Sequence, residues 1–123
     1  MITALVADDL TVRFYLKFIG DNGIELDFSV LLDTGFNRHV ALPRDIIDAL
    51  GYPSKSSVDI ELADGITQNV TLHNGRMIWD GQEVNVPIHC LAGEGLLGTL
   101  QAENYILTLP FCAGETVTLV LIP

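Results

Sequence analysis

Apolar and polar residues alternate along much of this chain. The alternation is clearest over residues 12–18, 24–32 and 84–90, where every second side chain is apolar. A period of two is typical of β-strands that bury one face. The sequence Asp-Asn-Gly at residues 21–23 separates the first two segments and predicts a hairpin between them. Residues 116–122 are rich in Val, Leu and Ile and predict a further, buried strand.

Short turn signals interrupt this pattern in the middle of the chain. Asp64-Gly65, Asn74-Gly75 and Asp80-Gly81 each predict a turn between strands. Pro87 has no backbone N–H to donate, so its place inside the third alternating segment indicates a sheet edge or a bulge. The middle of the chain is therefore expected to be a series of hairpins.

One helix is expected between Pro43 and Gly51. Proline suits a first helical position, and glycine suits the residue just past a helix end. The segment between them carries one apolar stripe, made of Ile46, Ile47 and Leu50. The sequence also admits a second short helix over Thr99–Glu103. Together the elements predict one small, closed, mostly β domain over residues 1–123, with six to eight strands.

Composition and charge exclude several classes of protein. The 123 residues are 49% hydrophobic and 18% charged, a balance typical of folded rather than disordered chains. Six Lys and Arg against 16 Asp and Glu give a net charge of -10, which disfavours binding to nucleic acid. There is no polybasic segment for a membrane surface, no long apolar run and no signal-peptide pattern. We therefore expect a cytoplasmic protein without a nucleic-acid or membrane partner.

The most informative local pattern is an acidic residue directly after an apolar strand. Leu31 and Leu32 lead into Asp33, Thr34 and Gly35. The strand draws Asp33 toward the interior, where a carboxylate needs hydrogen-bond donors. Glycine lets the backbone curl back and offer its N–H groups, and the threonine hydroxyl can bond to nearby backbone. The pattern is suited to holding a reactive carboxylate, although Asp and Gly are also common where a strand ends in a turn.

Two later motifs give the first one a context. Ala63-Asp64-Gly65 lies between strand-like segments, and Gly95-Leu96-Leu97-Gly98 follows 63 residues after Asp33, counted to Leu96. In this order the motifs resemble those of the retropepsin-like aspartic proteases. The similarity extends to the short single-domain clan AA proteases of prokaryotes over about residues 24–109. The motifs that carry it further are Asp33-Thr34-Gly35-Phe36, Leu42-Pro43, Ala49-Leu50-Gly51, Trp79-Asp80-Gly81 and Leu96-Leu97-Gly98-Thr99.

This resemblance implies a fold and an activity. The fold would be a small closed acid-protease barrel with one short helix. Asp33 would be catalytic, with Thr34 and Gly35 supporting it, and the apolar pair before Gly98 would support the same loop. The residues expected to contact a peptide or protein substrate are Phe36, Ala63, Asp64, Gly65 and Leu97. No cofactor or metal is implied.

The chemistry of this class needs two carboxylates, one to take a proton from water and one to polarise the scissile carbonyl. The chain contains a single Asp-Thr-Gly and no Asp-Ser-Gly. A two-fold homodimer would bring two copies of Asp33 together, because an isologous interface places a residue near the axis opposite itself. The apolar segments 1–6 and 116–122 are candidates for the subunit contact, or they complete the sheet of their own chain.

Three other interpretations compete with this one. Residues 93–98 match G-x-G-x-x-G, but residues 105–109 predict a strand where a dinucleotide site needs a helix. His39, His73, His89, Cys90 and Cys112 fit no zinc spacing, and both cysteines are expected to be free thiols. A non-catalytic peptide-binding or assembly module on the same fold is the alternative from another class, since a fold does not imply an activity.

Overall fold

The computed structural model describes residues 1–62 and 64–123. In those two ranges it contains ten strands and one helix. They are β1 (Ile2–Leu5), β2 (Arg13–Ile19), β3 (Glu25–Leu32), β4 (Val40–Leu42), α1 (Arg44–Leu50), β5 (Ser54–Glu61), β6 (Thr67–Trp79), β7 (Gln82–Cys90), β8 (Gly95–Leu97), β9 (Tyr105–Thr108) and β10 (Thr116–Leu121).

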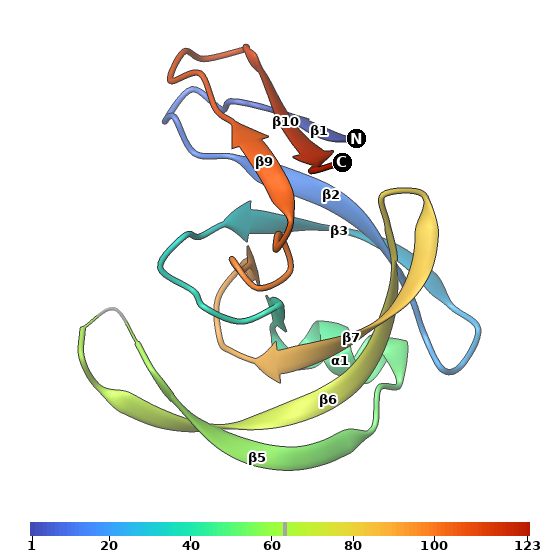
Figure 1. Ribbon diagram of the computed structural model, residues 1–123. Helices are drawn as coiled ribbons and strands as arrows, with labels where there is room; N and C mark the ends of the chain where they lie inside the picture. The colour runs from blue at the N-terminus through green and yellow to red at the C-terminus, as the bar shows by residue number, and fades with distance from the viewer. Residues whose placement is uncertain (63) are drawn as a thin grey trace.

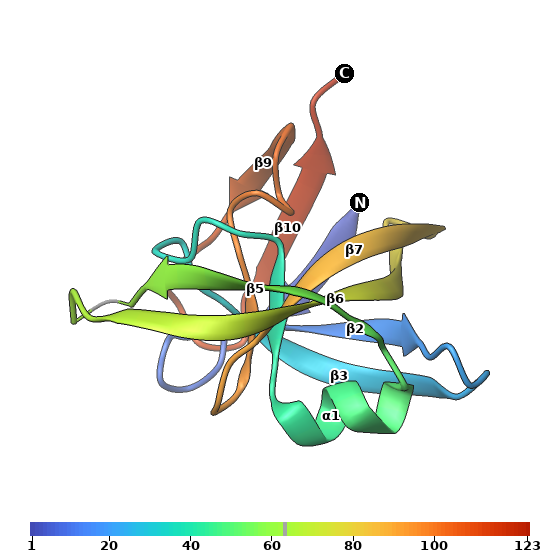
Figure 2. The same ribbon diagram turned by 90° about the horizontal axis from the view of Figure 1, so that it is seen from below.

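Six of the strands close into a barrel. Their order is β2-β3-β8-β4-β7-β6, and a pairing of Phe18 in β2 with Met77 in β6 completes the circle. β5 continues the sheet beyond β6 as an outer strand. Figure 1 shows the long β5–β6 hairpin sweeping below the barrel, and Figure 2 shows its tip projecting beyond the other elements. The predicted closed all-β barrel with one short helix is confirmed.

The period-two segments form strands that bury the predicted faces. In the β2–β3 ladder, Phe14 pairs with Val30, Leu16 with Phe28 and Phe18 with Leu26. Four of these side chains, those of Phe14, Leu16, Phe18 and Val30, are buried in the barrel core. Such cross-strand pairs fix the register, because a shift by one residue would turn every apolar side chain outward.

The helix forms where its flanking residues predict it. Pro43 has an extended conformation at the N-cap, and Gly51 adopts the left-handed conformation (φ 69°) that ends α1. Ile47 and Leu50 are fully buried in the core, and Ile46 packs at its edge. The helix is seven residues long, and no helix in the described ranges is long and apolar enough to cross a membrane.

A second sheet of three strands lies against the barrel, in the order β1-β10-β9. Its inner face packs on the core through Ile2, Ala4, Val117 and Leu119. Both candidate segments for a subunit contact therefore pair with each other within the chain. Figure 1 shows this sheet at the top of the molecule, with the two termini close together. Its outer face is left open to solvent by the described residues.

The structure corrects the predicted turn at Asn74-Gly75 and the number of strands. These two residues lie inside the 13-residue strand β6. A Cβ on Gly75 would lie 3.0 Å from Ile88 Cγ1 and 3.1 Å from Tyr52 Cε2. The glycine is therefore explained by a close approach of neighbouring side chains and not by a turn. The described ranges hold ten strands rather than six to eight, because several are only three or four residues long.

Two further expectations concern Thr99–Glu103 and Pro87. Residues 99–104 form successive turns, in which Ala102 N–H donates to Thr99 O (3.1 Å), so the predicted second helix is wrong. Pro87 pairs with β6, but the pairing of β7 with β4 begins only at Ile88. Pro87 therefore lies at a local sheet edge, as its missing donor predicts.

Candidate active site

The loop after β3 fixes the carboxylate of Asp33 close to its own backbone. Asp33 Oδ1 accepts a hydrogen bond from Gly35 N–H at 2.9 Å. Phe36 N–H donates to Asp33 O at 3.0 Å, which closes a tight turn. The N–H of Asp33 itself donates to Leu97 O at 3.1 Å. The side chain is therefore held at the end of β3 while remaining partly exposed.

The segment after β8 holds the other half of this loop. β3 and β8 run parallel, with Leu31 opposite Leu96 and Leu32 opposite Leu97. Just beyond the pair, Gly98 N–H donates to His39 O and Thr99 N–H to Phe36 O, both at 2.9 Å. A Cβ on Gly98 would lie 2.7 Å from Phe36 O, so only glycine fits. The two glycine-containing motifs of the sequence thus form one interlocked structure.

A cavity of about 460 Å³ opens beside Asp33. One wall is the loop after β3, and the opposite wall is the end of β5 with the residue that follows it. Its lining comprises Asp33, Gly35, Phe36, Asn37, Arg38, Ile60, Glu61, Leu62, Leu91 and Leu96. The lining combines five apolar side chains with four polar or charged ones. A concavity in which polar groups converge beside apolar side chains is typical of a ligand site.

A small apolar cluster separate from the barrel core contributes Phe36, Ile60 and Leu91 to the cavity lining. Its buried members are Phe36, Ala41, Ile60, Val70 and Leu91. The ring of Phe36 packs edge-on against the ring of His89, with centroids 6.0 Å apart. The cluster therefore connects the Asp33 loop to β5 and β6, the two strands of the projecting hairpin.

Some of the predicted site residues line the cavity, and others lie outside it. Asp33, Gly35 and Phe36 line the cavity, and Thr34 is exposed beside them. Leu97 is fully buried in the barrel core, and its neighbour Leu96 lines the cavity instead. Asp64 and Gly65 lie in the turn of the β5–β6 hairpin, outside the cavity lining. Ala63 lies outside the described residues.

Sequence reasoning missed most of the wall opposite Asp33. Ile60 and Leu62 lie two residues apart, so the alternation of residues 58–62 carried a signal for one apolar face. Arg38 lies close to Asp33 in sequence, in the same loop after β3. Leu91 and Glu61 carry no local signal, because only the packing of distant segments brings them to Asp33.

No cluster of three metal-ligating side chains occurs in residues 1–62 and 64–123. His73 is buried, and its ring nitrogens form hydrogen bonds with Thr71 Oγ1 (2.8 Å) and Tyr52 O (3.2 Å). Residues 95–97 of this motif form β8, and Gly98 is followed by turns and not by a helix. This arrangement lacks the helix that a dinucleotide site requires.

Burial governs the ionisation of His89. Only 5% of the residue is exposed, and its Nδ1 has no hydrogen-bond partner among the described residues. Burial lowers the pKa of His89 below its usual value, and the positive charges of Arg38 and His39 lower it further. Burial also lowers the pKa of His39, against the opposing field of Glu103. His89 is therefore neutral at neutral pH.

We expect stability to fall in acid because of His89. Its pKa is lower in the folded than in the unfolded state, so the unfolded chain binds the proton more tightly. The contribution of His89 to the free energy of unfolding is complete above its unfolded-state pKa, near 6.5, and is lost as the pH falls through its folded-state pKa. Urea unfolding at pH 7.5 and 5.0 should show a smaller loss for His89→Gln than for wild type. Equal losses in the two proteins would exclude His89 as the source.

No protein-family model matches the sequence, and no curated protein matches it. A comparison with solved structures does find a match. The crystal structure of a retropepsin-like aspartic protease from Rickettsia conorii matches with a TM-score of 0.63 and 18% sequence identity, over 96% of this chain and 88% of that chain. The chain therefore has the retropepsin-like fold, which confirms the resemblance predicted from its motifs.

Proposed function

We propose that the protein is an aspartic endopeptidase whose active site contains Asp33 from each of two copies of the chain. The observation that carries this proposal is the placement of Asp33. Its carboxylate is fixed by the Gly35 N–H, and the residue lies in the lining of the cavity. The retropepsin-like fold supports the same conclusion, because the matching structure is that of an aspartic protease.

Two facing Asp33 side chains would share one proton, since two adjacent carboxylates cannot both ionise cheaply. The ionised carboxylate would take a proton from water as the water oxygen attacks the scissile carbonyl carbon. The protonated one would donate a hydrogen bond to the carbonyl oxygen. Collapse of the tetrahedral intermediate breaks the C–N bond, and the leaving nitrogen receives the proton that the first carboxylate took from water. Phe36 and Leu96 would hold an apolar substrate side chain beside this centre.

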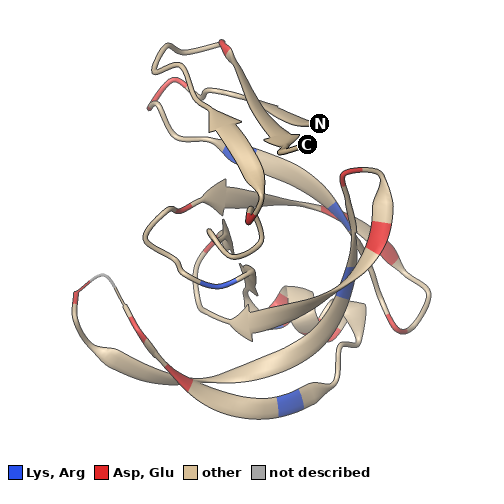
Figure 3. Cartoon of the chain, viewed as in Figure 1, with Lys and Arg blue, Asp and Glu red and all other residues tan. Residues whose placement is uncertain are grey.

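A second copy of the chain is the partner that completes such a site. The outer face of the β1-β10-β9 sheet supports this partner, because no charged residue occurs in these three strands. Figure 3 shows the sheet without charge in an otherwise acidic chain. Leu5 (64% exposed), Ile106 (53%) and Val120 (41%) point outward from it. Like-charge repulsion between two such faces would be small.

A non-catalytic peptide-binding module is the second candidate function. One chain supplies only one Asp33 to the cavity, so a chain that stays monomeric would hold a peptide without the second carboxylate. The apolar lining that would accept a substrate side chain serves binding equally well. The two functions differ in one measurable property, the hydrolysis of a peptide bond.

The test is incubation with a denatured protein and a synthetic peptide library from about pH 4 to 8, a window spanning the reference Asp and His values. New termini are identified by mass spectrometry. We expect cleavage with a bell-shaped pH profile that peaks on the acid side of neutrality, since the pair must hold one proton. Binding without cleavage at any pH would favour the module, and cleavage that rises steadily into alkali would indicate another catalytic group.

If the turn of the β5–β6 hairpin covers the cavity, it must open to admit a substrate. We therefore expect this turn to open readily. Gly65 N–H donates to Leu62 O at 2.9 Å, but Asp64, Gly65 and Ile66 are all exposed. Little apolar burial therefore protects these backbone amides. Hydrogen exchange at Asp64 and Gly65 should be much faster than in β3. Equally slow exchange in both places would argue against a moving cover.

A further inference from the structure

We propose that Arg38 makes this cavity select substrates with an acidic side chain next to the apolar residue that fills it. The inference rests on the proposed function and specifies its substrate class. Arg38 is the one basic residue among the described residues that line the cavity, in a chain with 16 acidic and six basic residues. Its guanidinium would meet the substrate carboxylate at the rim, while Phe36, Ile60 and Leu91 enclose the apolar neighbour.

The side chain of Arg38 is unengaged by the part of the chain that the structure describes. Four of the other five Lys and Arg residues have partners: Arg13 with Glu94, Lys17 with Glu25, Arg44 with Thr71 and Arg76 with Glu83. The fifth, Lys55, lies outside the cavity lining. Arg38 is exposed and forms no ion pair or side-chain hydrogen bond with the described residues. A guanidinium presents five donors in a planar fork that fits a carboxylate, so a free one in a cavity is ready for such a partner.

The backbone beneath Arg38 is fixed. Leu100 N–H donates to Arg38 O at 3.2 Å, and the neighbouring carbonyls of Phe36 and His39 accept from Thr99 and Gly98. The base of the side chain is thus held by the same contacts that hold the Asp33 loop. A charged group on such a rigid support loses less freedom on binding than one on a mobile loop.

Glu61 lines the cavity from the opposite wall, at the end of β5. No ion pair joins it to Arg38 in the described ranges. A carboxylate on the substrate would be attracted by Arg38 and repelled by Glu61, so removing each charge should have opposite effects on selectivity. Removal of the Glu61 charge should strengthen the selection of acidic substrates, and removal of the Arg38 charge should abolish it.

The experiment compares peptides that differ only in Glu, Gln or Lys at each position flanking the cleaved apolar residue. We expect wild type to prefer Glu over Gln by about 1.5- to fivefold in kcat/KM, the range of an exposed charge pair. Arg38→Gln should erase the preference, Arg38→Glu should invert it toward Lys, and Arg38→Lys should retain part of it. Glu61→Gln should enlarge it. The preference should also shrink between about 0.01 and 1 M salt, because salt screens such pairs.

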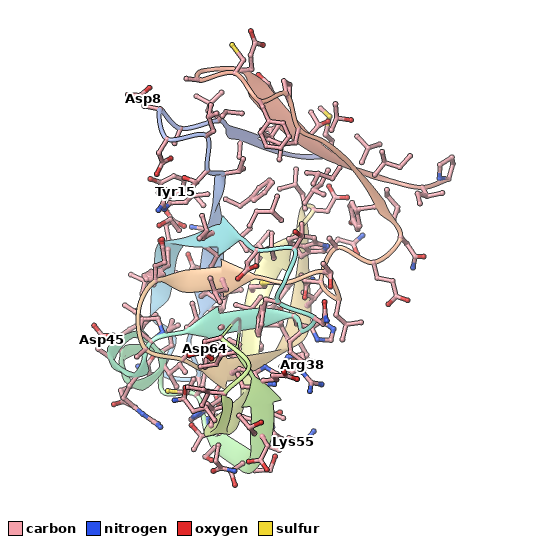
Figure 4. All side chains as sticks on the ribbon, turned by 90° about the vertical axis from the view of Figure 1, so that its left-hand side faces the viewer. Asp8, Tyr15, Arg38, Asp45, Lys55 and Asp64 are labelled. Carbon is pink, nitrogen blue, oxygen red and sulfur yellow. The ribbon has the colours of Figure 1, made fainter. Side chains whose placement is uncertain are left out.

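Lys55→Glu is the matched control. It makes the same charge reversal on β5, outside the cavity lining and about 20 Å from Glu61 along the strand. Figure 4 shows Lys55 on the lower part of the molecule, below the labelled Arg38. The control should leave the Glu preference unchanged. A Glu preference that survives Arg38→Gln, or one that is absent from wild type, would overturn the proposal.

Failure of the proposed function can be separated from failure of this inference. The same peptides are titrated by fluorescence polarisation into Asp33→Asn protein, with and without Arg38→Gln. If no peptide is cleaved by wild type, the endopeptidase proposal fails. Tighter binding of the Glu peptide that requires Arg38 would still support the selection of acidic ligands. Equal binding of Glu and Gln peptides would overturn it whether or not cleavage occurs.

Discussion

Replacing Asp33 with Asn should reduce peptide cleavage by about 10²–10⁴-fold, the range that general acid–base catalysis contributes. The amide cannot take a proton from water or share one with a second carboxylate. Its Oδ1 can still accept the hydrogen bond that Gly35 N–H now donates to Asp33 Oδ1. The loop should therefore keep its conformation, and the free energy of unfolding should change little.

The control for this variant is Asp9→Asn. Asp9 Oδ1 accepts the N–H of Thr11 at 3.1 Å, the same contact to the residue two positions on. Asp9 lies outside the cavity lining, so its replacement should leave kcat/KM near the wild-type value. Comparable activity in Asp33→Asn and wild type would reject Asp33 as the catalytic group. Unfolding of Asp33→Asn would be a different result, and circular dichroism identifies it.

Replacing Gly98 with Ala should be the most damaging change outside the carboxylate. A Cβ at this position would press on the backbone carbonyls of Phe36 and Arg38, and backbone cannot rotate away as a flexible side chain can. Overpacking of this kind costs about 1–3 kcal/mol or more. Because the same backbone carries Asp33, we expect lower stability in urea unfolding together with loss of cleavage.

Gly23→Ala separates crowding from backbone conformation. Gly23 has a positive φ of 84° with open space around its missing Cβ, whereas Gly98 is not among the residues with positive φ. Gly23→Ala should cost about 1–2 kcal/mol through strain alone and leave cleavage intact. If Gly98→Ala proves no worse than Gly23→Ala and keeps full activity, the contact between the two motifs does not support the site.

The sequence was sufficient for those features that local chemistry decides. Residues 12–18 and 24–32 alternate because they form strands that turn every second side chain toward the core. Pro43 and Gly51 bracket α1 because their backbone preferences suit the two ends of a helix. Asp33, Thr34 and Gly35 follow directly after β3, where the pattern located them.

Features that depend on packing between distant segments were not accessible in this way. Asn74-Gly75 resembles a turn in the sequence, yet Gly75 lies inside β6. The side chains of Ile88 and Tyr52 leave no room for a Cβ there. The resemblance pointed to Leu97 as a substrate contact, whereas the alternation along β8 turns Leu97 into the core and Leu96 toward the cavity. Arg38 and Glu61 line one cavity only because the fold brings the loop after β3 and the end of β5 to opposite walls.

The central claim is that catalysis requires Asp33 from two copies of the chain. It is tested most directly by co-refolding wild type with Asp33→Asn in equal amounts at fixed total concentration, then measuring cleavage. Random pairing into dimers leaves about one quarter of wild-type activity, because only a quarter of the pairs contain two carboxylates, whereas chains that act alone keep about one half. We predict about one quarter; a value of about one half would contradict the shared active site.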